Sequence, residues 1–201
     1  MAFERDGIRI VLINGSARPG NYTGKALAVV ADEFQKHEGV TVVTLEPGLL
    51  GLPLPGVDPG SEAARGFAEQ VASATAVVLA TPEYHGMFSS VIKLAIENMG
   101  FPSALRGKPV ALLGVASGAI GAVKSLEALR GVVSHVGALA LPLSISVANV
   151  QQVFDAEGRC LDQASERHIR RLATGMMEYV HGHICPAVTL ERVLREGLTA
   201  V

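Results

Sequence analysis

Five short runs of apolar residues, rich in branched side chains, recur along the chain. They span 8–13 (IRIVLI), 40–45 (VTVVTL), 76–81 (AVVLAT), 110–116 (VALLGVA) and 138–147 (ALALPLSISV). Most of these runs show little alternation of apolar and polar positions, which is typical of strands that are buried on both faces of a sheet. The pattern therefore predicts a parallel sheet with helices on both faces.

Helical periodicity fills the gaps between these runs, because apolar residues there recur three and four positions apart. The residues that mark the five expected helices are Leu27, Val30, Ala31 and Phe34; Ala64, Phe67, Ala68 and Val71; Val91, Leu94 and Ala95; Ala122, Leu126, Leu129 and Val133; and Ile169, Leu172, Ala173 and Met176. Regular alternation of strand and helix indicates a doubly wound α/β fold with right-handed crossovers. Five strands favour the flavodoxin-like order 2-1-3-4-5 over a six-stranded Rossmann arrangement.

Two segments fall outside this alternation. A loop rich in Pro and Gly covers 47–60, and a tail follows Pro186, where Thr189 is expected to cap a short helix that contains Val193 and Leu194. Neither segment is a domain, and a chain of 201 residues suits one domain. We therefore expect a single flavodoxin-like domain over 1–201, with a C-terminal extension from about residue 186.

Composition and charge narrow the class of protein. The chain is 49% hydrophobic and 18% charged, the balance of an ordinary globular protein. With a formal net charge of −2 and no basic cluster longer than Arg170-Arg171, nucleic acid is not an expected partner. The sequence shows no signal-peptide pattern and no apolar segment of roughly 18 residues, so no membrane association is expected. Cys160 and Cys185 form no CxxC pair and are expected to be free thiols of a cytoplasmic protein.

The loop after the first predicted strand, NGSARPGNYTGKAL at 14–27, has the composition of an anion site. It lies where open α/β sheets bind ligands, outside the carboxyl ends of the strands. The start of the next helix offers unpaired N–H groups and the positive end of the helix dipole. Ser16, Asn21 and Thr23 add short side-chain donors, and Arg18 adds a positive charge.

Two familiar phosphate motifs do not fit this loop. A Walker A motif requires Gly-Lys followed by Ser or Thr, whereas Lys25 is followed by Ala26 and Pro19 stands in place of the first glycine. A dinucleotide fingerprint requires GxGxxG, whereas Gly15 is followed by Ser-Ala. What remains is a loop that closes on a terminal monophosphate, as flavodoxins hold FMN, or else a plain strand-to-helix turn with a Ser/Thr cap.

A second and a third loop follow the third and fourth predicted strands. The segment Pro82-Glu-Tyr-His-Gly86 is expected beside the first loop, because strands one and three are neighbours in this fold. Its turn, with Tyr84 and His85, can supply backbone groups and a planar wall for a flat ring. In 116–122, Gly118 and Gly121 allow the main chain to approach a ligand closely, although glycines serve equally as turn formers.

Together these motifs resemble the NAD(P)H-dependent FMN reductase family, which includes flavin, quinone, azo and chromate reductases of flavodoxin-like fold. The resemblance covers most of the chain. The motif Gly-Ser-x-Arg is matched at 15–18, and Pro-Glu-Tyr-Asn/His-Gly, the most specific of the motifs, at 82–86. A third motif, Ser-Gly followed by glycines and Leu-Arg, is matched within 117–130, with Ala122 in place of the second glycine.

The resemblance implies a role for each of these residues. The phosphate of FMN would be held by Ser16, Arg18, Asn21 and Thr23, with Tyr22 beside it. The isoalloxazine ring would lie against Pro82, Glu83, Tyr84, His85, Gly86, Ser117, Gly118 and Gly121. In this family hydride passes from NADPH or NADH to FMN and on to a small-molecule electron acceptor, so no catalytic side chain is implied. A homodimer or homotetramer is also implied.

Other readings remain open at this point. A flavodoxin-like electron-transfer or flavin-carrier protein would not oxidise NAD(P)H itself. Flavodoxins tend to be acidic with aromatic rings around the flavin, whereas this chain is near neutral and has no Trp, which favours the enzyme. A phosphate-ligand binder without flavin is a weaker alternative. The segment HGHIC at 181–185 lacks a fourth ligand, so no metal site is expected there.

Overall fold

The computed structural model describes residues 7–196, without the side chains at 192, 193, 195 and 196. Its strands are β1 (Ile8–Asn14), β2 (Val40–Leu45), β3 (Ala76–Tyr84), β4 (Met87–Phe88), β5 (Pro109–Val115) and β6 (Leu139–Val147). Its helices are α1 (Tyr22–Phe34), α2 (Glu62–Ala72), α3 (Ser90–Glu97), α4 (Val123–His135), α5 (Val150–Val153), α6 (Gln163–Tyr179) and α7 (Cys185–Glu196). A 3₁₀ turn, η1 (Pro47–Leu49), follows β2, and a π-helical segment, η2 (Val180–Ile184), joins α6 to α7.

The sheet has the parallel order β2-β1-β3-β5-β6, and the short β4 pairs antiparallel with the end of β3. With β4 set aside, this is the predicted order 2-1-3-4-5, so the flavodoxin-like fold is confirmed. The interior strand β5 is buried along its whole length, whereas the edge strand β2 has exposed residues. Burial on both faces explains why the central runs lack alternation.

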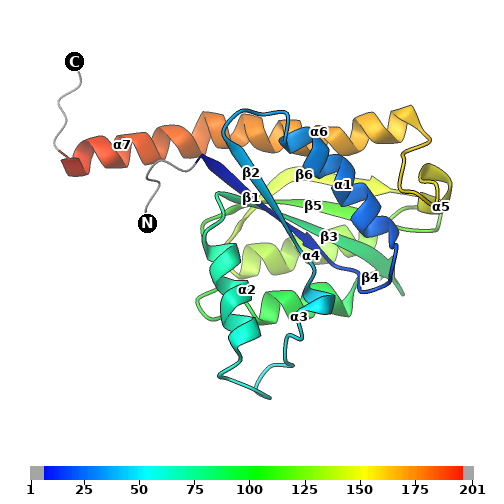
Figure 1. Ribbon diagram of the computed structural model, residues 1–201, viewed down its shortest axis with the longest axis horizontal. Coiled ribbons are helices and arrows are strands. Elements are labelled where there is room, and N and C mark those ends of the chain that lie inside the picture. The colour runs from blue at the N-terminus through cyan, green and yellow to red at the C-terminus, as the bar shows by residue number, and fades with distance from the viewer. Residues whose placement is uncertain (1–6, 197–201) are drawn as a thin grey trace.

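Helices cover both faces of the sheet, as the apolar periodicity predicts. In Figure 1, α1 and α6 lie on one face and α2, α3 and α4 on the other. Two apolar clusters result: Phe34, Leu27 and Met176 belong to the first, and Phe67 and Leu129 to the second. The five predicted helices all lie within the described residues, and most of their marker residues are buried.

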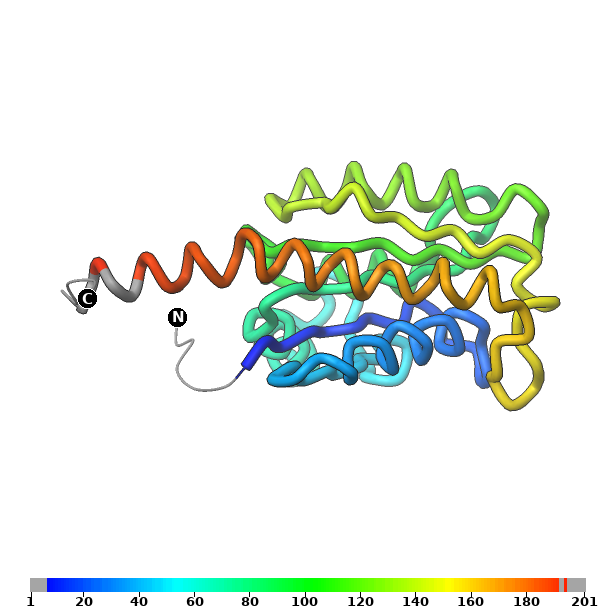
Figure 2. The backbone as a smooth tube through the Cα atoms, turned by 90° about the horizontal axis from the view of Figure 1, so that it is seen from above, coloured from blue at the N-terminus to red at the C-terminus, as the bar shows by residue number. Residues whose placement is uncertain are grey.

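The structure adds the short elements η1 and α5, which the sequence pattern did not predict, and it departs from the prediction elsewhere too. β3 runs on to Tyr84, because Glu83 and Tyr84 pair with the unpredicted β4. α6 continues through η2 into α7, so that one helix runs along the domain and projects past it (Figure 2). Thr189 lies inside this helix, where its hydroxyl donates to the carbonyl of Cys185, so the predicted helix cap at Thr189 is wrong. The single domain over 1–201 stays a prediction, and residues 1–6 and 197–201 lie outside the described part.

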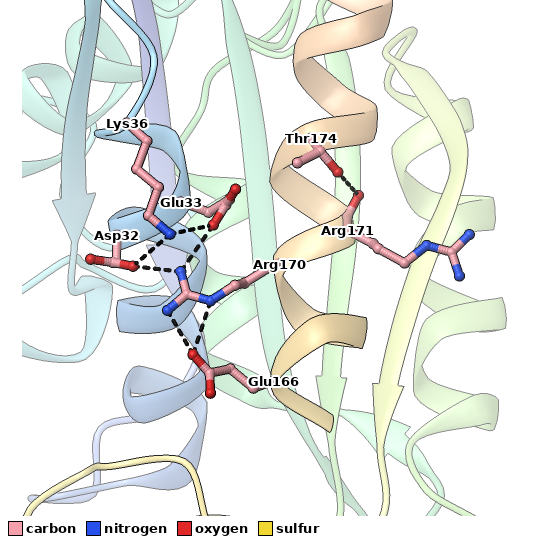
Figure 3. Close-up of polar contacts among 7 residues, drawn as sticks. All are labelled: Asp32, Glu33, Lys36, Glu166, Arg170, Arg171 and Thr174. Atoms are coloured by element: carbon pink, nitrogen blue, oxygen red, sulfur yellow. Dashed lines mark hydrogen bonds and ion pairs between the residues drawn. The ribbon is translucent and has the colours of Figure 1, made fainter. Parts of the chain in front are cut away.

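An ion-pair network joins α6 to the last turn of α1 (Figure 3). Arg170 contacts Asp32, Glu33 and Glu166, and Lys36 lies 2.8 Å from Glu33. Carboxylates in the last turn of a helix are unfavourable beside the negative end of its dipole, and these cations offset that cost. The hydrogen bond from Arg170 lowers the pKa of Asp32, while hydrogen bonds from Lys36 and then Arg170 lower the pKa of Glu33.

We expect Arg170→Met to reduce the free energy of unfolding by about 1 to 2 kcal/mol at neutral pH, because several partly exposed pairs are lost together. Carboxyl groups with lowered pKa values stabilise the fold above their ordinary values of 3.8 and 4.5, and this contribution disappears as the pH falls through the folded values. The difference between wild type and variant should therefore shrink from pH 6 to pH 3. Urea unfolding across this range measures it.

Arg171→Met is the matched control, since Arg171 is exposed and points away from the network in Figure 3. It should leave both the stability and its pH dependence close to wild type. Equal losses in the two variants, or a loss in Arg170→Met that does not depend on pH, would contradict the role assigned to the network.

Candidate functional site

A pocket opens at the edge of the sheet where β1, β3 and β5 end. Its cavity has a volume of about 210 Å³ and is open to solvent on one side. Its lining comprises Arg18, Pro19, Gly20, Asn21, Tyr22, Thr23, Pro82, Glu83, Tyr84, Val115, Ala116, Ser117 and Val150. Three loops that are far apart in the sequence thus meet around one cavity.

The first loop closes on the start of α1. Asn21 is the N-cap, since its Oδ1 accepts the N–H of Gly24 at 2.6 Å, and its Nδ2 donates to the carbonyl of Arg18 at 2.8 Å. The first N–H groups of a helix have no carbonyl partner within the helix, and the first-turn residues Tyr22 and Thr23 line the pocket. This end of the pocket therefore combines backbone donors, the positive end of the helix dipole and a guanidinium.

A side chain from β3 and the N-cap side chain of α3 fix the base of this loop. The hydroxyl of Ser89 donates to the carbonyl of Gly15 at 2.6 Å and accepts the N–H of Ile92, so it also caps α3. Thr81 in turn accepts the N–H of Ser89 at 3.0 Å. A Cβ at Gly15 would lie 2.4 Å from the carbonyl oxygen of Ala80, so only glycine allows β1 to end this close to β3. The first and second loops are thereby held at a fixed separation.

The second loop is a tight hairpin turn between β3 and β4. His85 (φ 53°) and Gly86 (φ 75°) both have left-handed backbone conformations, as the two central residues of a type I′ turn require. Asparagine, aspartate and histidine are the residues other than glycine that adopt this conformation most often. Next to the turn, the guanidinium of Arg18 lies 4.9 Å from the centre of the Tyr84 ring. This cation–π contact joins the first loop to the second.

The connection from β6 to α5 supports the third loop from below. The N–H groups of Asn149 and Val150 donate to the carbonyls of Gly118 and Ala116, at 3.2 and 3.1 Å. The side chain of Gln151 donates to the carbonyl of Ser117. Because these carbonyls have partners, the path of the third loop is set by α5 as well as by β5.

Gly121 and its neighbour show why the start of α4 needs small residues. Gly121 has φ 78°, and a Cβ there would lie 2.3 Å from the hydroxyl oxygen of Ser146. That oxygen accepts the N–H of Ala122 at 2.9 Å. The methyl group of Ala122 is buried and packs where a side chain at Gly114 would otherwise lie. The alanine at this position is therefore accommodated in the core and does not line the pocket.

Most of the site residues expected from the sequence line the pocket. They are Arg18, Asn21, Tyr22, Thr23, Pro82, Glu83, Tyr84 and Ser117. Ser16, His85, Gly86, Gly118 and Gly121 belong to the same loops but do not line it. The lining residues that sequence reasoning missed are Pro19, Gly20, Val115, Ala116 and Val150. Most of these lie in loops already singled out, whereas Val150 reaches the pocket only through the packing of α5.

No helix within 7–196 is both long enough and apolar enough to cross a membrane. No group of three His, Cys, Asp or Glu side chains described there is arranged to hold a metal ion. In the HGHIC segment, His183 stacks on the ring of Tyr179 with 4.6 Å between centroids.

We expect His85→Val to lower the free energy of unfolding by about 1 to 3 kcal/mol, because a β-branched side chain is strained at positive φ. His85→Asn should change it by less than about 0.5 kcal/mol, since asparagine tolerates this conformation. Urea denaturation of both variants gives the comparison. A similar loss in both would mean that the imidazole ring, and not the backbone conformation, determines the stability of the turn.

The chain is similar in sequence to known FMN reductases and quinone reductases. Residues 8–152 match the family model described as NADPH-dependent FMN reductase. An NAD(P)H-dependent FMN reductase of Pseudomonas aeruginosa is 30% identical over 187 residues, which cover 87% of this chain and 96% of the relative. A 2-hydroxy-1,4-benzoquinone reductase of a Burkholderia species is 28% identical over 154 residues, covering 69% of this chain and 84% of the relative.

A solved structure shares the fold. The flavoenzyme NAD(P)H:(acceptor) oxidoreductase FerB of Paracoccus denitrificans superposes with a TM-score of 0.72 at 23% identity, over 88% of this chain and 98% of its own. The family match spans β1 to α5 and so includes all three loops of the pocket. The chain therefore belongs to the NADPH-dependent FMN reductase family of oxidoreductases.

Proposed function

We propose that the pocket binds FMN and that the protein passes hydride from NADPH or NADH through FMN to a small electron acceptor. The observation that carries the proposal is the meeting of three loops around one pocket, with Arg18 and the start of α1 in the first loop and Tyr84 in the second. Membership of the FMN reductase family supports the same ligand.

The phosphate of FMN fits the end of the pocket formed by the first loop. Arg18 supplies charge, and the first-turn N–H groups of Tyr22 and Thr23 supply donors. The side chain of Asn21 is occupied by its bonds to Arg18 and Gly24, so we assign it to the shape of the loop. Ser16 acts in the same way, because its hydroxyl accepts the N–H of Arg18 at 3.4 Å.

The isoalloxazine ring fits between the second and third loops. Pro82 and Tyr84 lie on one side of this part of the pocket, with Ala116 and Ser117 in the neighbouring loop. FMN supplies the redox chemistry when it is bound, by accepting hydride from the nicotinamide and passing reducing equivalents to the acceptor. The chain itself binds and orients the two substrates and excludes water, with no protein nucleophile or metal in the scheme.

We further propose that the acceptor is a flavin, a quinone, an azo compound or a metal oxyanion. The relative named for a benzoquinone supports a quinone, and relatives named as azoreductases support an azo compound. A homodimer or homotetramer is proposed as well, with the 47–60 loop at the contact, since Leu49, Leu54 and Val57 are mostly exposed there. We also propose a cytoplasmic location, where Cys160 and Cys185 would remain free thiols.

The purified protein tests this function directly. We expect it to bind FMN. With FMN and a benzoquinone present, it should oxidise NADPH or NADH in steady state, and the loss of absorbance at 340 nm measures this oxidation. FMN binding without NAD(P)H oxidation would instead identify a flavin carrier. Failure to bind FMN at all would contradict the proposal. The remaining alternative would then be a protein that binds other phosphate ligands.

Arg18→Ala should weaken FMN binding by roughly 1.5 to 3 kcal/mol, or about ten- to a hundredfold in Kd, because a charged phosphate contact is lost. Quenching of flavin fluorescence during titration measures the affinity. Arg65→Ala is the matched control: Arg65 is an exposed arginine of α2 that pairs only with Glu62 of its own helix among the described residues. If Arg18→Ala bound FMN as tightly as the control, Arg18 would not belong to the site.

A further inference from the structure

The start of α4 is capped by a residue from another loop. Its N-cap residue, Ala122, has no side-chain acceptor. Instead, Oε2 of Glu83 accepts the backbone N–H of Ser125 at 3.0 Å and the hydroxyl of the same residue at 3.1 Å. Ser125 is the third residue of the helix, the position whose N–H a local capping side chain ordinarily satisfies. A carboxylate at a helix N-terminus is also favoured by the dipole.

This cap lies between the two loops assigned to the isoalloxazine ring. Glu83 is flanked by Pro82 and Tyr84, which line the pocket, and its backbone pairs with Phe88 in the β3–β4 hairpin. The helix that it caps begins directly after the third loop, 116–122. Ser125 is fully buried, so its hydroxyl has no access to water as an alternative partner. The carboxylate therefore fastens the second loop to the end of the third.

We propose that Glu83 is a positioning residue for the flavin ring, which it holds in place through Ser125 and the start of α4. The inference rests on the proposed function, because it concerns the same FMN site. If Glu83 has this role, the separation of the two loops that bind the ring depends on an acceptor oxygen at residue 83. A displacement of about 1 Å between groups that contact a ligand is enough to impair binding and catalysis.

The competing role for Glu83 is proton transfer to the ligand. In the structure Glu83 acts as an acceptor, since Oε2 accepts two bonds from Ser125. A positioning residue needs an acceptor oxygen and tolerates an amide, whereas an acid or base needs an ionisable group. Glu83→Gln and Glu83→Ala therefore separate these roles.

The experiment measures the Kd for FMN and the thermal stability of the same set of variants. Glu83→Ala should raise the Kd for FMN about tenfold, while Glu83→Gln recovers affinity to within about threefold of wild type. Ser61→Ala is the matched control, because Ser61 caps α2 through the N–H of Ala64 at 3.3 Å, away from the pocket. It should lower thermal stability as Glu83→Ala does, with FMN affinity within about twofold of wild type. Ser125→Ala keeps the backbone donor and should raise the Kd for FMN about threefold. This variant replaces Glu83→Ala in the comparison if Glu83→Ala does not fold.

A second measurement needs no flavin. Hydrogen exchange of the Ser125 amide in FMN-free protein should be faster in Glu83→Ala than in wild type and Glu83→Gln. The positioning role is overturned if Glu83→Ala or, in its place, Ser125→Ala binds FMN like wild type. It is also overturned if Ser61→Ala weakens binding equally, or if Glu83→Gln binds as poorly as Glu83→Ala. Failure of wild type to bind FMN would instead overturn the proposed function, while the exchange data would still report on the cap.

Discussion

The parallel arrangement of β1, β3 and β5 is the constraint on which the pocket depends. Because neighbouring parallel strands end at the same edge of a sheet, the loops that leave them must meet. The adjacency of the strands alone does not fix the positions of the loops to within a fraction of an ångström. Hydrogen bonds to each loop fix these positions here. Ser89 holds the first loop at Gly15, Glu83 holds the second loop to Ser125, and the N–H of Val150 holds the third loop at Ala116.

Helix α1 shows how the rest of the fold supports this edge. Its first turn lies at the pocket, where Asn21 caps it, and its last turn carries Asp32 and Glu33, which Arg170 joins to α6. The helix is therefore fastened at both ends, and its apolar face packs on the sheet through Leu27 and Phe34. A phosphate that binds at the first turn would meet donors whose positions are already set, which lowers the entropic cost of binding.

Local patterns predict the strands and helices, the alternation of the two predicts the sheet order, and the family motifs predict most of the pocket. Buried strands lack alternation, helices repeat every three to four residues, and loops such as 14–27 carry their turn residues with them. The partner of Glu83 at the start of α4 could not be predicted, since Ser125 lies 42 positions away and no periodicity links the two. The contribution of Val150 was missed for the same reason. Thr189 was wrongly placed at a helix start, because a threonine inside a long continuous helix has the same local surroundings as a cap.

The most direct test of one shared flavin site is the crystal structure of the protein with FMN. We expect the phosphate within hydrogen-bonding distance of Arg18 and of the N–H groups of Tyr22 or Thr23. The isoalloxazine ring should lie between Tyr84 and Ser117. A flavin bound away from the edge where β1, β3 and β5 end, or one whose ring contacts neither the second nor the third loop, would contradict it.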